Sequence, residues 1–312
     1  MVKIERYSEM KKDEWDSFLL RAKNAHFFFR REYLAYHRDR LQDFSLFCYD
    51  EKNRLLALLP ANLTGNLLVS HGGLTFGGFL VDAHMTAEIM LDLFQAVRDF
   101  LRNVGIQRWI YKCIPYIYCT YPAEEDRYAL FVNRAKLIRR DVSTAIYLPQ
   151  RYPYQERRKR AIRKAEKQTL FVEESHDYEA YWKLLQEVLL ERHHSEPVHT
   201  FQEMQLLAKA FTKNIRLFTA QNSDEILAGT VIFENETIVH TQYLANGVCG
   251  RNCGALDLLL HYLITKVYAD KMYFDFGISN ENEGRFLNVG LISQKEGFGA
   301  RAVTHDFYEV EV

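Results

Sequence analysis

The sequence lacks the features of exported, membrane-spanning and disulfide-rich chains. Its first residues contain no apolar segment of the kind that forms a signal peptide. Its most apolar run, residues 256–264, is interrupted by Asp257 and His261 and is too short to cross a bilayer. The 5 cysteines are scattered and odd in number, which argues against a disulfide framework. We therefore expect a protein of the reducing cytoplasm without a transmembrane segment.

Neither sign of charge dominates. The chain has 40 Lys plus Arg against 41 Asp plus Glu, so no overall attraction to nucleic acid is implied, although a local basic patch can still exist. Six prolines are too few for a proline-rich linker. Disordered chains contain few aromatic residues, whereas this chain has 14%. The 312 residues allow one large domain or two of medium size, ordered nearly throughout.

Three common site motifs are also absent. No Gly-x-Ser-x-Gly turn presents a nucleophile, and no Gly-Lys-Ser/Thr sequence marks a nucleotide-binding loop. No histidines recur at the His-x-x-x-His spacing of a helical metal site, so we expect no bound metal.

Two segments share one order of predicted elements: a hairpin of two strands, a glycine-rich loop, an amphipathic helix and a third strand. In the first segment they fall at residues 55–60, 67–71, 72–78, 86–103 and 109–111. In the second they fall at residues 226–233, 238–243, 247–254, 255–268 and 272–276. The repetition predicts a duplicated unit.

Strands mixed with helices predict an α/β (α+β) fold with a mixed sheet. Because the two copies fall on either side of residue 150, we expect two domains, 1–150 and 151–312. Between the copies, residues 154–168 read as a strongly basic helix. Arg160 and Lys164 lie on its polar surface and are candidate contacts for phosphate groups. The alternative is a solvated connecting helix.

The second glycine-rich loop precedes a helix, where free backbone N–H groups and the helix dipole favour an anion. Gly250, Gly254 and Ala255 would allow the backbone to approach a pyrophosphate, and Arg251 would add a charge-assisted contact. An ordinary turn with close helix packing is the alternative.

The strand before this loop carries His240, Thr241, Gln242 and Tyr243. On a regular strand, His240 and Gln242 would face one side and Thr241 and Tyr243 the other. His240 is a candidate general base because histidine titrates near neutral pH. A buried histidine that only completes a hydrogen-bond network is the alternative.

Asp275 lies in an apolar strand that is followed by glycine and by Ser279, which is typical of a site at the carboxyl end of a strand. Asp275 could orient an amine or accept its proton, and capping is the alternative role for Asp275 and Ser279. Further on, Lys295 and Glu296 lie among glycines, where they could line the pocket or form a surface turn. In the first copy, His71 and Lys112 occupy matching places and are candidate substrate contacts.

The order of these residues resembles the GNAT superfamily of acyltransferases and, within it, the FemAB-like proteins with tandem GNAT domains. The segments that carry the resemblance are residues 157–165, 227–229, 240–243, 254–257 and 273–277. The resemblance is best over residues 150–300, and the first half matches by architecture.

The resemblance implies two tandem GNAT-like domains, each a mixed, mostly antiparallel sheet flanked by helices. It further implies transfer of an acyl group from acyl-CoA to an amine or hydroxyl acceptor, in cell-envelope or exopolysaccharide biosynthesis. The loop Q/R-x-x-G-x-G/A of GNAT members holds the CoA pyrophosphate. Arg251 and Gly254 match this pattern, and Leu256 departs from it.

In the implied mechanism, the acceptor attacks the acyl carbonyl directly. His240 or Asp275 would remove its proton, Tyr243 would donate one to the leaving group, and Glu296 would complete the catalytic set. Gln242, Ser279 and Lys295 would contact substrate. The acceptor would be a small molecule or a glycan- or lipid-linked group. Two alternatives are an aminoacyl-tRNA-dependent FemAB-type transferase and a non-catalytic binding protein on a degenerate GNAT scaffold.

Overall fold

The computed structural model describes residues 2–36 and 38–312. The chain divides into two compact units. Unit 1 comprises residues 1–141, 280–286 and 304–312, and unit 2 comprises residues 142–279 and 287–303. Two C-terminal segments thus group with the first unit, and the independence of the halves 1–150 and 151–312 stays a prediction.

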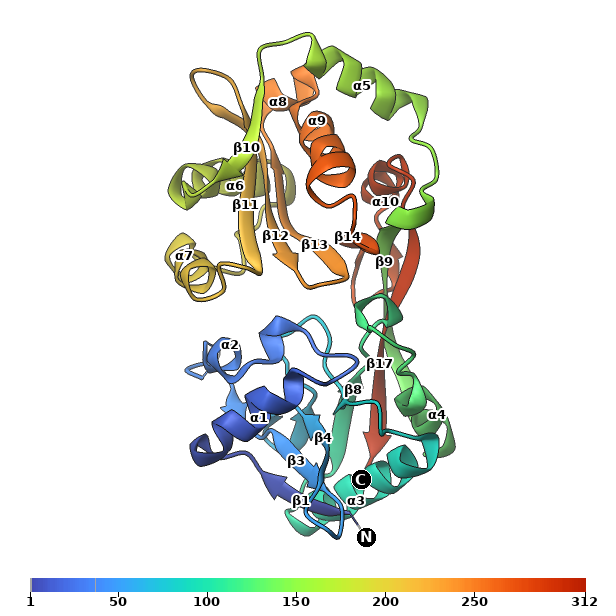
Figure 1. The fold of residues 1–312 in the computed structure, drawn as a ribbon. Coiled ribbons are helices and arrows are strands. Elements are labelled where there is room, and N and C mark those ends of the chain that lie inside the picture. The colour runs from blue at the N-terminus through green and yellow to red at the C-terminus, as the bar shows by residue number, and fades with distance from the viewer. Residues whose placement is uncertain (1, 37) are drawn as a thin grey trace. The chain divides into compact units, whose positions relative to one another are not determined.

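The described residues of the first half form short strands and the α-helices α1 to α4 (Figure 1). Its elements are β1 (Lys3–Arg6), α1 (Lys12–Leu19), α2 (Arg31–Ala35), β2 (Gln42–Asp43), β3 (Leu46–Tyr49), β4 (Leu55–Leu59), β5 (Asn62–Thr64), β6 (Leu67–Val69), β7 (Leu80–Val81), α3 (Ala87–Asn103), β8 (Arg108–Lys112) and α4 (Glu125–Val132).

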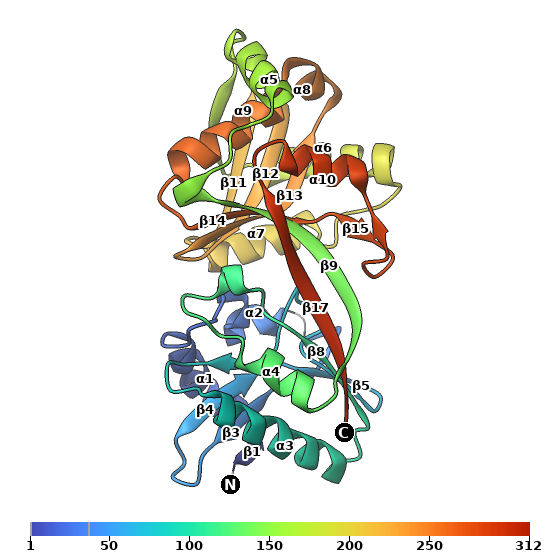
Figure 2. The ribbon, with the colours of Figure 1, turned by 90° about the vertical axis from the view of Figure 1, so that its right-hand side faces the viewer.

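The second half contains longer strands. Its elements are β9 (Lys136–Tyr147), α5 (Glu156–Glu166), β10 (Phe171–Ser175), α6 (Tyr178–His193), α7 (Phe201–Ala210), β11 (Ile215–Gln221), β12 (Ile226–Glu234), β13 (Ile238–Asn246), α8 (Val248–Cys253), α9 (Ala255–Tyr262), β14 (Tyr273–Ile278), β15 (Asn280–Glu281), β16 (Phe286–Leu287), α10 (Val289–Glu296) and β17 (Arg301–Glu311). Figure 2 shows β9 and β17 as long strands, and each contributes residues to both units.

Unit 2 is built on the strand order β10-β11-β12-β13-β14-β9. Every neighbouring pair is antiparallel except β13 and β14, which are parallel. Ala228 and Ile232 of β12 pack with Leu256 of α9 in the core. Gly229, on the opposite face, lies so close to Tyr181 of α6 that a Cβ would clash. Helices α9 and α6 therefore cover opposite faces of this sheet (Figure 1).

Unit 1 contains two sheets. One has the order β1-β3-β4-β7, and the other joins β17, β8, β6, β5 and β2. Here the parallel pair is β6 with β8, connected through α3. Helix α3 begins at the N-cap Thr86, whose side chain accepts a hydrogen bond from the amide of Ile89, and its apolar face packs into the core with Phe94 and Trp109.

The mixed α/β fold with mostly antiparallel sheets flanked by helices is confirmed. The expected hairpin of residues 55–60 and 67–71 is wrong, because β4 pairs with β3 and β7 whereas β6 pairs with β5 and β8. The extra strand β5 takes the hairpin position, so only the second copy, β12 with β13, has the hairpin as expected. Within the described residues, no helix combines the length and apolar content needed to cross a membrane.

Candidate functional site

The parallel strands β13 and β14 pair over three positions only: Ile238 with Tyr273, Val239 with Phe274, and His240 with Asp275. Beyond the last pair, β13 continues to Asn246 and β14 to Ile278 without pairing to each other. His240 and Asp275 therefore stand where the two strands part, and we call this place the unit 2 wedge.

Asp275 and His240 form a hydrogen-bonded pair at the wedge. Nδ1 of His240 lies 2.8 Å from Oδ2 of Asp275. The other carboxylate oxygen accepts hydrogen bonds from Oγ of Ser143 at 2.6 Å and from the amide of Gly277 at 3.0 Å. Asp275 is fully buried, whereas the His240 side chain is 16% exposed. The carboxylate is thus fixed in the core and holds an imidazole that reaches the surface.

This geometry equips His240 as a base. A carboxylate at Nδ1 favours the tautomer that carries its proton there, which leaves Nε2 to accept a proton. The carboxylate also stabilises the imidazolium that forms. Gly277 has φ +76°, and a Cβ there would approach Cε1 of His240 to 3.1 Å. Glycine is therefore needed both for the backbone conformation and for the space beside the ring.

A β-bulge changes the expected faces of β13. Val231 lies opposite Tyr243, but the next residue, Ile232, lies opposite Thr241, so Gln242 is the additional residue. Because residues opposite one another share a face, Tyr243 lies on the face of His240, which pairs with Phe233. The expectation that Tyr243 shares a face with Thr241 is wrong because the bulge shifts the alternation by one residue.

Tyr243 hydrogen-bonds to His199, which sequence reasoning did not single out. The Tyr243 hydroxyl lies 2.6 Å from Nδ1 of His199, and the ring of Trp182 packs edge-on against Tyr243 with centroids 5.2 Å apart. Gln242 also hydrogen-bonds to Tyr243 through its side chain. His199 lies in the loop between α6 and α7, where no motif marks it, as is also true of Ser143. Their roles depend on strands and loops that meet only in the fold.

Ser279 directly follows β14, and the side chain of Lys295, from α10, reaches the end of this strand. Nζ of Lys295 donates to the carbonyl oxygens of Gly277 at 2.8 Å and Ile278 at 2.7 Å. Burial lowers the pKa of Lys295 to about 8, and the nearby charge of Asp275 opposes this shift. Ser279 is fully buried, and its amide donates to the carbonyl of Val142. Lys295 thus fixes the segment that follows Asp275.

Glu296 follows Lys295 at the end of α10 and is partly exposed. In the described part of the chain, its carboxylate makes neither a hydrogen bond nor an ion pair. The structure therefore brings His240, Asp275 and Lys295 together but shows no contact between Glu296 and this group.

The expected phosphate loop is mostly helical. Residues 248–253 form α8, and Gly254 adopts φ +86° between α8 and α9. A Cβ at Gly254 would come within 2.5 Å of the carbonyl oxygen of Ala161 in α5, and one at Gly250 would clash with the carbonyl of Leu227. Arg251 donates to the carbonyl of Asn246 at 2.8 Å. These glycines thus permit close packing within unit 2.

Helix α5 packs on α9 through an ion pair. Arg158 binds Asp257, in the first turn of α9, at 2.7 Å, and burial raises the pKa of Asp257 while Arg158 opposes that shift. Asp257 thus places a negative charge in the helix turn where Ala255 begins α9. On the outer surface of α5, Arg160 and Lys164 are exposed.

In unit 1, Lys112 is buried and donates to the carbonyl oxygens of His71, at 3.0 Å, and Leu74. Burial lowers the pKa of Lys112 to about 7, and Arg139 reinforces the shift. His71 is also buried, has φ +51°, and lines a pocket of about 260 Å³ with Arg31 and Asn62. The two residues expected to contact substrate thus meet at one loop.

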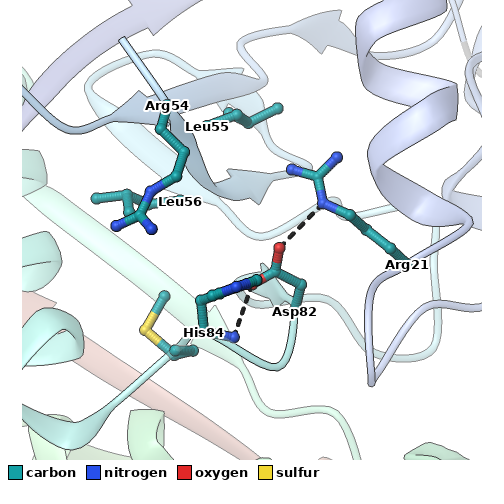
Figure 3. A pocket seen from close by; sticks show the side chains of 7 residues that line it. Arg21, Arg54, Leu55, Leu56, Asp82 and His84 are labelled. Atoms are coloured by element: carbon teal, nitrogen blue, oxygen red, sulfur yellow. Dashed lines mark hydrogen bonds and ion pairs between the residues drawn. The ribbon is translucent and has the colours of Figure 1, made fainter. Parts of the chain in front are cut away.

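Another unit 1 pocket, of about 250 Å³, is shown in Figure 3. Its two arginines are already paired, Arg21 with Asp82 at 3.0 Å and Arg54 with Asp50 at 3.1 Å, and His84 also faces Asp82. This pocket contains none of the residues expected from the sequence. Across the described residues, no three His, Cys, Asp or Glu side chains gather as a metal site would require.

Both the sequence and the fold of the chain were compared with those of known proteins. Residues 154–285 match the acetyltransferase (GNAT) domain family. Among proteins of curated function, none matches the chain in sequence.

Three solved structures are similar over nearly the whole chain. FemX has a TM-score of 0.68 and 10% identity, with 97% of this chain and 96% of that chain covered. The C-terminal domain of a putative lysylphosphatidylglycerol synthetase from Agrobacterium fabrum has a TM-score of 0.61 and 8% identity, with 97% and 92% covered. A tandem GNAT protein from the clavulanic acid biosynthesis pathway has a TM-score of 0.54 and 11% identity, with 100% and 98% covered.

At these identities the structural similarity shows the fold, and the family match adds the domain type. The resemblance inferred from the sequence is therefore confirmed at this level: residues 154–285 match the GNAT domain family, and the chain shares the fold of FemX and of a tandem GNAT protein.

Proposed function

We propose that the chain is an acyltransferase in which His240 is the general base. The observation that carries the proposal is the pair of His240 and Asp275 where β13 and β14 part. A buried carboxylate with two further donors holds the imidazole in one orientation and one tautomer. Such a base is suited to deprotonating an amine or hydroxyl as it attacks an acyl carbonyl.

The reaction has two proton transfers. The acceptor nitrogen or oxygen forms a bond to the acyl carbon, and its proton moves to Nε2 of His240. The bond from the acyl carbon to the leaving oxygen or sulfur then breaks, and the leaving atom keeps the electron pair and takes a proton from Tyr243. Asp275 stays ionised and stabilises the imidazolium. Lys295 holds the carbonyl groups after Asp275 and so keeps the wedge in place.

Acyl-CoA is the donor that the GNAT domain favours. Its phosphates would be expected at residues 250–255, before α9. In the structure, Ala161 of α5 closely approaches Gly254, and Asp257 supplies a negative charge to the first turn of α9. An anion at this turn would be repelled by Asp257 unless Arg158 or the cations of α5 compensated. CoA binding here therefore depends on α5.

Aminoacyl-tRNA is a second candidate donor, and the exposed surface of α5 favours it. Arg160, Arg163, Lys164 and Lys167 are exposed, and in the described part of the chain no carboxylate pairs with them. Cations separated by one helical turn lie about 5 Å apart along the axis, which suits successive phosphates of one strand. The similarity to FemX and to a putative lysylphosphatidylglycerol synthetase supports an acceptor of the cell envelope, lipid-linked or glycan-linked.

The test compares donors directly. Thermal unfolding would be measured with acetyl-CoA, a longer acyl-CoA and lysyl-tRNA, because a ligand that binds the folded state raises its stability. Transfer to amine and hydroxyl acceptors would follow with the donor that binds. We expect His240→Ala to lower kcat by about 100-fold or more without abolishing donor binding.

Charge reversal separates the two donors. Arg160→Glu with Lys164→Glu should abolish salt-sensitive tRNA binding, whereas Lys209→Glu with Lys213→Glu, also exposed in unit 2, should leave it unchanged. Donor binding with an undiminished rate in His240→Ala and Asp275→Asn would refute the proposed base. Failure of every donor to bind would favour the non-catalytic scaffold.

A further inference from the structure

A second hydrogen-bonded pair lies on the same face of β13 as the proposed base. Tyr243 and His240 are two register steps apart on that face, about 7 Å along the strand. The Tyr243 hydroxyl oxygen contacts His199 twice, at 2.6 Å from Nδ1 and at 3.3 Å from the backbone nitrogen. Trp182 fixes this contact, since its indole N–H donates to the His199 carbonyl at 3.3 Å.

The state of His199 decides where the Tyr243 hydrogen points. A tyrosine hydroxyl has one hydrogen to donate and lone pairs that accept. If Nδ1 of His199 lacks a proton, it accepts a hydrogen bond from the Tyr243 hydroxyl. Tyr243 then has no hydrogen left to donate to a substrate. If Nδ1 carries a proton, it donates to the oxygen, which also accepts from the backbone N–H of His199 and from the Gln242 side chain. The hydroxyl hydrogen is then free for another acceptor.

Tyr243 itself is suited to remain protonated. Burial raises the pKa of its hydroxyl above the ordinary value, and the charge of Glu203 in α7 adds to the shift. The other titratable groups around the pair are Glu179 and Lys183 of α6, which pair with each other at 3.2 Å, Glu196 of the loop, and Tyr181.

His199 also borders a space that solvent can enter. It lines a pocket of about 320 Å³ between α6 and α7, together with Glu196 and Thr200. The ring thus lies between Tyr243 and a pocket with polar walls, which gives a route by which it can exchange protons with water.

We propose that His199 is a positioning residue that controls Tyr243 and passes a proton to it during transfer, an inference that rests on the proposed function. As the bond to the leaving oxygen or sulfur breaks, the Tyr243 hydroxyl proton moves to the leaving atom. The Nδ1 proton of His199 moves to the Tyr243 oxygen in the same step. His199 ends neutral and regains a proton from water in the adjoining pocket.

The first test needs no substrate. Side-chain ¹⁵N NMR of the full chain, titrated from pH 5 to 9, reports whether Nδ1 of each histidine is protonated, and His199→Asn identifies the His199 signal by its loss. We expect Nδ1 of His199 to carry a proton near neutral pH, and Tyr243→Phe to shift its titration. An Nδ1 that stays unprotonated through the whole range would overturn the proposal.

The second test uses the pH dependence of kcat with whichever donor supports transfer. The reaction requires a neutral His240 and a protonated His199. The pH profile of the wild-type kcat should therefore be bell-shaped. His199→Asn can hold a hydrogen bond but cannot pass a proton, so it should lose the alkaline limb and about 100-fold in kcat, with KM nearly unchanged. Tyr243→Phe should have the same effect, and the double variant no more.

An alkaline limb that survives in His199→Asn, or losses that add in the double variant, would overturn the relay. If no donor supports transfer, the proposed function fails, and the NMR titration still decides whether His199 and Tyr243 are coupled.

Discussion

In each unit a pair of parallel strands is joined through a helix, and the two pairs end differently. In unit 1, β6 and β8 pair at three positions, and Lys112 then closes the gap by binding the carbonyl groups of His71 and Leu74. In unit 2, β13 and β14 also pair at three positions, and His240 with Asp275 lies at the end, partly open to solvent. The same backbone arrangement thus ends in a structural lysine in one unit and in a candidate base in the other.

Buried carboxylates show the same contrast. Asp126 of unit 1 accepts a hydrogen bond from the Tyr111 hydroxyl at 2.8 Å, and burial raises its pKa to about 6. Asp275 of unit 2 has Ser143, the Gly277 amide and His240 around it. Asp126 thus binds a tyrosine hydroxyl within the core, whereas Asp275 also holds an imidazole and can support proton transfer.

The largest expected difference between the units is therefore in these two aspartates. Asp275→Asn removes the charge that orients His240 and stabilises its cation, so kcat should fall by about 100-fold or more, as in His240→Ala. Asp126→Asn keeps a partner for Tyr111 and should leave kcat within about 2-fold, because Asp126 contacts none of the residues proposed for the site. Steady-state kinetics of both variants, with circular dichroism to verify folding, measures the contrast. Equal losses of kcat in the two variants would remove the functional distinction between the units.

The buried lysines should give the units different pH dependences of stability. Lys112 and Lys295 have folded pKa values of about 7 and about 8, below the ordinary 10.5. Between the folded and unfolded pKa values the unfolded chain binds more protons, so the free energy of unfolding rises with pH. The rise from Lys112 begins near pH 7 and that from Lys295 near pH 8, each amounting to roughly a few kcal/mol by pH 10.

Urea unfolding of Lys112→Met and Lys295→Met from pH 6 to 10 checks this sign. Each variant should lack its part of the rise, and Lys112→Met should depart from the wild-type slope at the lower pH. A wild-type stability that falls over this range in step with lysine deprotonation would contradict the burial argument. Only Lys295→Met should also lower kcat, because Lys295 fixes the segment after Asp275.

Two glycines allow a smaller comparison. Gly78 has φ +82° and Gly277 has φ +76°; a Cβ at the first would meet the Tyr111 hydroxyl at 2.7 Å, and one at the second Cε1 of His240 at 3.1 Å. Both alanine variants should lose about 1 to 3 kcal/mol of stability through backbone strain. Thermal unfolding and kcat together distinguish them, because Gly277→Ala should also displace the base. An unchanged kcat in Gly277→Ala would mean that the ring tolerates the contact.

The sequence predicted the parts of the site that lie on one strand or follow a motif. His240 and Asp275 stood out because polar side chains are unusual in apolar strands, and β13 and β14 do bring them together. The bulge at Gln242 could not be predicted, because it depends on the register with β12. His199 and Ser143 come from a loop and from a distant strand, so only the tertiary structure reveals them.

The duplication was harder to predict in detail. The helix and the strand after it recur in both copies as expected, but β5 replaces β4 as the hairpin partner of β6 in unit 1. Short apolar segments such as 55–60 and 67–71 pair equally well with several neighbours, and the hydrophobic pattern alone does not select one. In the sequence, Gly250 and Gly254 are compatible with a ligand-binding loop and with a junction between two helices. Only the structure shows that α5 closely approaches Gly254 at such a junction.

The smallest expected difference concerns two helix caps. Thr86 accepts from the amide of Ile89 at the start of α3, and Thr200 accepts from that of Glu203 at the start of α7, where Glu203 also binds back to the Thr200 amide. Thr86→Ala and Thr200→Ala should each cost about 1 kcal/mol in urea unfolding. Thr200 follows His199 directly, so its loss should loosen the loop that holds Tyr243. Thr200→Ala should therefore shift the ¹⁵N titration of His199, whereas Thr86→Ala should not, and an identical titration in both variants would show that the cap stabilises α7 without ordering that loop.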